Sequence, residues 1–129
     1  MTSSFKPKGY STVSPYLIAK GAQQIIEFLK KTFGARELQR FNFPDGSIAH
    51  AEVQIGDTVV MIGDPGTNWS PVSAHLHVYV ENVDDCYQRA LEAGGVSVQA
   101  PERKGEEPNR RAGVKDPAGN TWWIATQVV

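Results

Sequence analysis

The stretch DPAGNTWWIAT, residues 116–126, predicts how the last part of this chain folds. Its first five residues are turn formers, and the β-branched and aromatic residues after them are typical of a strand. Successive side chains of a strand point to opposite faces. We therefore expect Trp122, with Ile124, to lie in the core, and Trp123, with Ala125, to face a different environment.

The two halves of the chain show the same order of elements. A strand, a helix and three further strands are expected in residues 13–19, 21–33, 36–43, 48–55 and 58–62. The same order recurs in residues 74–80, 83–93, 96–100, 110–115 and 121–126. Placing Ser14 on His75 also places Gly34 on Gly95, each glycine being the expected end of a helix. The halves therefore align with one offset.

This repetition predicts an α+β fold of two tandem βαβββ modules. We expect a single domain over residues 1–129, with module one at about 10–64 and module two at about 72–129. A linker rich in turn formers, residues 64–71, joins the modules and contains Trp69. An exposed Trp in such a linker can border a pocket or pack against a neighbouring module or subunit.

Composition excludes several classes of function. The chain has 129 residues, of which 40% are hydrophobic and 21% are charged, as in a globular domain. A formal net charge of −1 argues against a nucleic-acid partner, which needs a basic surface. No segment has the length of a membrane span, and residues 1–9 lack the apolar run of a signal peptide. Cys86 is the single cysteine, and we expect it to be a buried thiol. Because one cysteine cannot form a disulfide within the chain, we predict a soluble, cytoplasmic protein.

Alternation along the strands separates a core face from an opposite face. In residues 49–55 the apolar set is Ala49, Ala51, Val53 and Ile55, which leaves His50, Glu52 and Gln54 opposite. In residues 75–80 the apolar set is Leu76, Val78 and Val80, which leaves His75, His77 and Tyr79. Alignment of the halves adds Ser14, Tyr16 and Ile18 to this second face.

The segment HLHVYVENVDDCYQRALEAGG, which opens the second module, and DPAGNTWWIA, which closes it, resemble the glyoxalase/bleomycin-resistance/extradiol-dioxygenase superfamily, also called vicinal oxygen chelate proteins. SPYLIAKGAQQIIEFLKKTFGA and IAHAEVQIGDTVVMIGD are most similar to its PhnB-like branch. The resemblance covers residues 13–126. It implies curled mixed sheets that form a cup, with helices outside and a ligand or metal inside. It also implies a homodimer in which the cup can be completed across subunits.

The resemblance also implies where a metal would bind. Metal-dependent members place one ligand on each of the first, fourth, fifth and eighth strands, and the matching positions here are Ser14, Met61, His75 and Trp123. Only His75 is an ordinary ligand, and an indole offers a metal no lone pair. We therefore expect no cofactor at these positions. An alternative site for Ni, Zn, Fe or Mn would combine His50, Glu52, His75 and His77 if their strands approached each other, although histidine pairs on strands are more often hydrogen-bonded or solvent-facing.

Three functions remain open at this point. The first is a small-molecule-binding protein, for planar or cationic ligands, whose cup is lined by Tyr16, His50, Glu52, Met61, His75, His77, Tyr79, Arg111 and Trp123. The second is an enzyme, either a metal-dependent lyase, isomerase or dioxygenase, or a metal-free one. In the metal-free case His50 or His75 is a general base, Glu52 orients it and Arg111 stabilises an oxyanion. The third is a regulatory or structural dimer without any bound small molecule.

Overall fold

The structure is a computed structural model and describes residues 5–129, so the first four residues of the segment 1–9 lie outside the described residues. The first half contains β1 (Tyr16–Ile18), α1 (Ala22–Phe33), β2 (Arg36–Asn42), β3 (Ile48–Ile55) and β4 (Thr58–Gly63). The second half contains β5 (His75–Tyr79), α2 (Val83–Glu92), β6 (Val96–Glu102), β7 (Asn109–Lys115) and β8 (Thr121–Gln127). The predicted order of elements is therefore confirmed in both halves.

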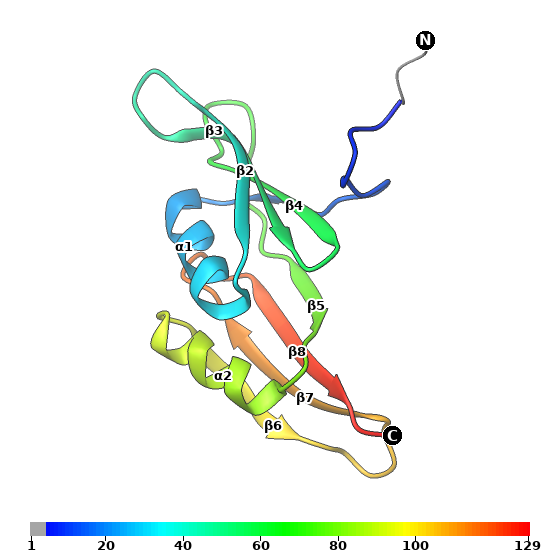
Figure 1. Cartoon of the computed structure of the whole chain (residues 1–129). Coiled ribbons are helices and arrows are strands. Elements are labelled where there is room, and N and C mark those ends of the chain that lie inside the picture. The colour runs from blue at the N-terminus through cyan, green and yellow to red at the C-terminus, as the bar shows by residue number, and fades with distance from the viewer. Residues whose placement is uncertain (1–4) are drawn as a thin grey trace.

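Each half forms a four-stranded mixed sheet, with the order β1-β4-β3-β2 in one and β5-β8-β7-β6 in the other. β1 runs parallel to β4, and β5 runs parallel to β8, whereas the other neighbours are antiparallel. The two helices contact each other, α1 packing on β3 and β4, and α2 on the second sheet (Figure 1). The α+β fold is thus confirmed as two sheets that do not close, with helices packed on one face of each.

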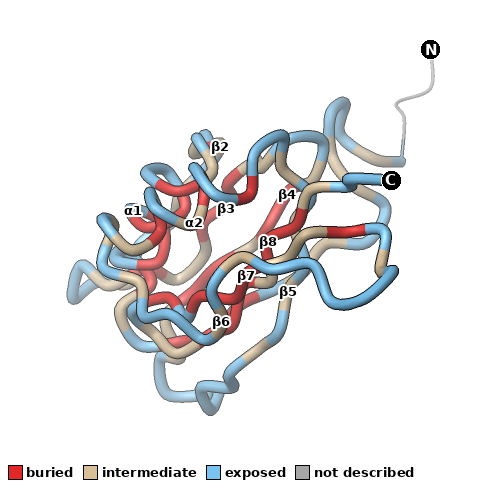
Figure 2. The backbone as a smooth tube through the Cα atoms, turned by 90° about the horizontal axis from the view of Figure 1, so that it is seen from below, coloured by how far each residue is buried: buried red, intermediate tan, exposed pale blue. Residues whose placement is uncertain are grey.

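The core lies between the sheets and the helices and draws on both halves (Figure 2). Trp122 is 1% exposed, and its ring lies 5.5 Å from the ring of Phe33, measured between centroids. Cys86 is buried and its thiol donates to the carbonyl of Thr32, as expected of a structural thiol. Gly34 ends α1 with a φ of 67°, a conformation that favours glycine. No helix within the described residues is long and apolar enough to span a membrane.

The turn at residues 116–120 is held by a single buried carboxylate. Asp116 accepts hydrogen bonds from the backbone N–H groups of Ala118 and Asn120, from the Asn120 amide and from the Trp122 indole. The Asn120 side chain in turn accepts from the backbone N–H of Ala74, directly before β5. These bonds hold Trp122 in the core and fix β8 beside β5. Trp123 must therefore point to the opposite face of the sheet.

β3 departs from the predicted alternation at one residue. Its pairing with β2 shifts register between Phe41, opposite His50, and Asn42, opposite Ile48, so that Ala49 is extra. Such a bulge moves neighbouring side chains onto different faces. Ile48 is buried in the core, whereas Ala49 lines a pocket with Tyr16. The prediction that Ala49 faces the helices is therefore wrong, while the core positions of Ala51 and Val53 are confirmed.

Candidate functional site

The predicted ligand-binding residues, joined by Tyr10, fall into two clusters on different sheets. The tyrosine–histidine cluster, on the first sheet and the segment before it, consists of Tyr10, Tyr16, His50, Glu52 and Met61. The histidine–tryptophan cluster, on the second sheet, consists of His75, His77, Tyr79, Arg111 and Trp123. Among residues 5–129, no hydrogen bond or ion pair joins the two clusters. The two clusters of one chain are therefore separate.

The tyrosine–histidine cluster is a chain of hydrogen bonds. Tyr10 donates to one oxygen of Glu52 across 2.5 Å, and the Nε2 of His50 lies 2.9 Å from the other oxygen. Because a carboxylate only accepts, His50 donates from Nε2, and its Nδ1 accepts from the Tyr16 hydroxyl at 2.8 Å. Both ring nitrogens of His50 are therefore bonded within the protein.

Charge in this cluster is concentrated on Glu52. Burial raises the pKa of Glu52, but the hydrogen bonds from Tyr10 and His50 outweigh it, so that the pKa lies below its usual value. The hydrogen bond to Glu52 raises the pKa of Tyr10. Burial, followed by the charge of Glu52, raises the pKa of Tyr16. At neutral pH the cluster therefore combines one anionic carboxylate with two protonated phenols.

Within this cluster the position of Met61 was predicted from the sequence, whereas that of Tyr10 was not. Met61 pairs in register with both Tyr16 and Glu52, so the structure places it among them, as expected. Tyr10 was missed, because it lies in an irregular segment before β1 where no periodicity assigns a face. Ser14 also lies before β1, which begins only at Tyr16, and so it is outside the sheet.

An apolar pocket of about 390 Å³ adjoins this cluster at Tyr16. Its other lining residues are Ile18, Phe43, Ala49, Asp64 and Trp69. Trp69 is 68% exposed and comes from the linker between the modules. The carboxylate of Asp64 accepts hydrogen bonds from the backbone N–H groups of Gly21, Ala22 and Ile48. It therefore anchors the linker to the start of α1 and to β3. The pocket is thus lined by aromatic side chains, and the backbone around Asp64 is held in place by hydrogen bonds.

Trp123 forms a flat surface on the second sheet. Its indole N–H donates to the Nδ1 of His75 across 3.1 Å, and the two rings are stacked at 13° with centroids 6.2 Å apart. Gly113 pairs with Trp123 on the neighbouring strand, and a Cβ atom there would come within 2.7 Å of the Trp123 ring. The absence of a side chain at Gly113 therefore lets the indole lie across β7.

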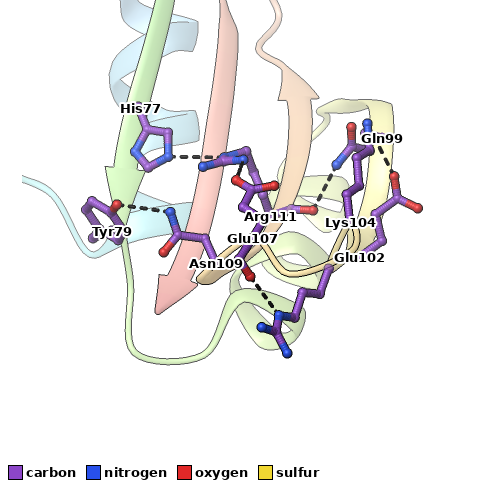
Figure 3. Close-up of polar contacts among 9 residues, drawn as sticks. His77, Tyr79, Gln99, Glu102, Lys104, Glu107, Asn109 and Arg111 are labelled. Carbon is purple, nitrogen blue, oxygen red and sulfur yellow. Dashed lines mark hydrogen bonds and ion pairs between the residues drawn. The ribbon is translucent and has the colours of Figure 1, made fainter. Parts of the chain in front are cut away.

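Polar side chains line a cavity together with this indole. Figure 3 shows the contacts that these polar side chains and their neighbours make with one another. Arg111 donates from Nε to the Nε2 of His77 across 3.2 Å and forms an ion pair with Glu107. Asn109 donates to the hydroxyl of Tyr79 at 3.1 Å, and the rings of His77 and Tyr79 meet edge to face at 4.8 Å. Burial, and then the charge of Arg111, lower the pKa of His77, which Glu107 opposes in part. His77 is therefore neutral at neutral pH.

A cavity of about 400 Å³ lies within this cluster and is lined by His77, Gln99, Glu102, Lys104, Glu107, Arg111 and Trp123. Glu107 and Asn109 were not among the predicted residues, because they lie at the end of a charged segment that gave no strand pattern. A wider groove of about 940 Å³ between the two halves reaches His77 and Tyr79 but no other predicted ligand-binding residue. Of the two, the smaller cavity is the one that brings Arg111 and Trp123 together.

The comparison with known families agrees with this architecture. The family model described as "Glyoxalase/Bleomycin resistance protein/Dioxygenase superfamily" matches residues 12–124. The chain belongs to this superfamily. An uncharacterised protein of Mycobacterium bovis is 35% identical over 127 residues, which cover 90% of this chain and 83% of that protein.

Solved structures of other proteins show the same fold. TioX from Micromonospora sp. ML1 is 24% identical, with a TM-score of 0.75 over 92% of this chain and 99% of that one. FosX from Listeria monocytogenes, a fosfomycin resistance protein, is 17% identical, with a TM-score of 0.69 over 92% of this chain and 94% of that one. At these identities the likeness concerns the fold.

The side chains of one chain do not match the metal-binding pattern of the superfamily. At the eighth-strand position the indole N–H of Trp123 donates a hydrogen bond to His75, the only ordinary ligand among the four matching residues. His50 and Glu52 lie on β3, and His75 and His77 on β5, in a different sheet. In residues 5–129 no group of three or more His, Cys, Asp or Glu side chains is arranged to hold a metal. Glu52 and Arg111, which the metal-free enzyme hypothesis combines, also lie on different sheets, and each has its own partner.

Proposed function

We propose that this protein binds a small organic molecule on the open faces of its sheets, without a metal ion. The main support for this proposal is the stacked and hydrogen-bonded pair of Trp123 and His75. At the position where the superfamily pattern expects a metal ligand, this pair provides an aromatic surface. Tyr16, Tyr79 and Trp69 add further aromatic surface that is 47%, 65% and 68% exposed. Structural neighbours that include fosfomycin resistance proteins from two bacteria support a small molecule as the class of partner.

The lining favours a ligand with a flat apolar part and polar substituents. Aromatic side chains bind flat apolar groups through large contact areas. Arg111, His77 and the tyrosine hydroxyls supply donors and acceptors that orient the polar substituents. The pocket beside Tyr16 and the cavity beside Trp123, about 390 and 400 Å³, are each within the size range of small-molecule sites.

Two measurements on the purified full chain test this proposal. Titration of a panel of planar drugs and metabolites, followed by calorimetry and tryptophan fluorescence, is expected to yield saturable binding that Trp123→Ala weakens. Metal analysis of protein purified without chelators is expected to find no stoichiometric Ni, Zn, Fe or Mn. Absence of saturable binding across the panel would refute the binding function, and a stoichiometric metal lost in His75→Gln would refute its metal-free character.

The hydrogen-bonded chain from Glu52 through His50 to Tyr16 favours a second function, metal-free proton transfer. Glu52 would orient His50, whose Nδ1 would accept the proton of a bound substrate that takes the place of the Tyr16 hydroxyl. Arg111 of the same chain would not serve this site, since it lies on the other sheet. Mass spectrometry of each bound compound after incubation tests this function. Chemical change that His50→Gln abolishes, with binding retained, would favour catalysis, whereas unchanged compounds would leave a binding protein.

We also infer the oligomeric state of the protein, its branch within the superfamily and its location in the cell. The aromatic side chains exposed on both sheets are consistent with a homodimer in which two half-sites meet, and light scattering of the purified protein tests its mass. The segments SPYLIAKGAQQIIEFLKKTFGA and IAHAEVQIGDTVVMIGD support the PhnB-like branch. One free, buried cysteine is consistent with a soluble protein of the reducing cytoplasm.

A further inference from the structure

The cavity beside Trp123 has two features that act on different parts of one ligand. The indole is a flat apolar surface, held by Gly113 beneath it and by its hydrogen bond to His75. Arg111 lines the same cavity, and its guanidinium is oriented by the neutral ring of His77. A guanidinium in a fixed orientation recognises a carboxylate with particular strength, because its N–H groups match the two oxygens.

The guanidinium of Arg111 is already paired with a carboxylate of the protein. Glu107, in the loop of residues 103–108 between β6 and β7, forms its ion pair with Arg111 at the edge of the cavity (Figure 3). The backbone of Glu107 is held separately, since its N–H donates to Lys104 and its carbonyl accepts from Arg103. The Glu107 side chain can therefore turn into solvent while the loop keeps its place.

Charge in the cavity is otherwise balanced. Lys104 lies 3.5 Å from Glu102, and both side chains are at least half exposed, so solvent screens this second pair. Glu107 and Arg111 are the less exposed pair, at 30% and 26% of the side chain. An incoming anion that replaced Glu107 would restore the partner of Arg111, whereas a cation that paired with Glu107 would leave Arg111 without one.

We propose that this cavity binds a planar aromatic carboxylate, whose ring lies against Trp123 and whose carboxylate displaces Glu107 from Arg111. This proposal rests on the binding function proposed above and specifies the class of ligand. Glu107 then acts as an internal competitor that keeps the site closed to weakly binding anions. The volume of about 400 Å³ accommodates a bicyclic ring with one acidic substituent.

Three probes that share one ring system test the class of ligand: 2-naphthoate, the neutral 2-naphthamide and the cationic 2-naphthylmethylammonium. Calorimetric titration of the full chain is expected to rank naphthoate as the tightest. Glu107→Gln should strengthen naphthoate binding about tenfold, since it removes the competing carboxylate, and should leave naphthamide almost unchanged. Glu106→Gln is the matched control, because it removes the same charge from an exposed position of the same loop.

Arg111→Gln should weaken naphthoate binding about tenfold or more, again with little effect on naphthamide. Equal strengthening by Glu107→Gln and Glu106→Gln would mean that net charge alone matters and would overturn the displacement. Tightest binding of the ammonium probe would overturn the preference for a carboxylate and leave the binding function standing. Failure of all three probes, together with the broader panel above, would instead count against the binding function itself.

Discussion

The Nδ1 atom of His75 accepts a hydrogen bond from the indole N–H of Trp123 across 3.1 Å, and the two rings are stacked at 13°. His75 is the residue that a superfamily metal site would need most in this chain. Its Nδ1 lone pair is already used, and the neighbouring position carries an indole with no lone pair for a metal. In the proposed function, the same pair forms the aromatic surface on which a ligand would lie.

Restoration of a carboxylate at position 123 should not create a metal site by itself. Trp123→Glu would supply one more ligand, but Met61 is a poor ligand for hard divalent metals and Ser14 lies before β1. We expect no stoichiometric Ni, Zn or Mn in this variant when it is dialysed against metal and analysed by mass spectrometry. Tight binding of one metal per chain would show that the ligand positions were mapped wrongly.

The flat position of Trp123 should depend on Gly113. In Gly113→Ala the new methyl group would lie 2.7 Å from the indole, so the ring must move. We expect a changed tryptophan emission and weaker binding of aromatic probes, both measured in one fluorescence titration. The effect of Gly113→Ala on binding should vanish when Trp123 is already alanine. A loss of the same size in that background would mean that Gly113 acts through the fold and not through the indole.

Asp116 should be among the most sensitive polar positions for stability. Asp116→Ala would leave buried donors of Asn120 and Trp122 without an acceptor. Each such group costs about 1–3 kcal/mol, so we expect a loss of about 3 kcal/mol or more in the free energy of unfolding, measured with urea. Asp57→Ala, in the exposed turn before β4, should change it by less than about 0.5 kcal/mol. Equal effects would contradict the role of the buried carboxylate.

The faces of most strands could be predicted from sequence, because the side-chain period of a strand is fixed. Trp122 is buried, and Trp123 lies on the other face, as alternation requires. Ala49 could not be placed in this way. Its face depends on a bulge in the pairing of β3 with β2, and a bulge is set by two strands together and not by the pattern of one.

The grouping of site residues was harder to predict than their faces. His50 and His75 each face away from the helices, but strand pairing places them in separate sheets. Periodicity along one strand contains no information on which other strand lies beside it. Tyr10 and Glu107 belong to irregular segments, so their contacts with Glu52 and Arg111 follow from tertiary structure alone.

The titration of His77 should report on Arg111. Burial and the Arg111 charge lower the pKa of His77 below its ordinary value of 6.5, so the unfolded chain binds more protons just below that pH. This contribution to stability is therefore present above pH 6.5 and is lost as the pH falls from there through the lower, folded value. In an NMR titration, Arg111→Gln should raise the pKa of His77. An unchanged pKa would show that burial alone sets it.

Trp69 should affect binding without affecting stability. Its side chain is 68% exposed, so Trp69→Ala should change the free energy of unfolding by less than about 0.5 kcal/mol. It should nevertheless weaken the binding of bulky aromatic probes, because it removes one wall of the pocket that Tyr16 and Phe43 also line. Val72→Ala is the matched control, since Val72 is also 68% exposed, follows the same linker and lies outside that pocket. If both variants bind the probes as the unmodified protein does, ligands use the Trp123 face alone, and the recess beside Tyr16 takes no part in recognition.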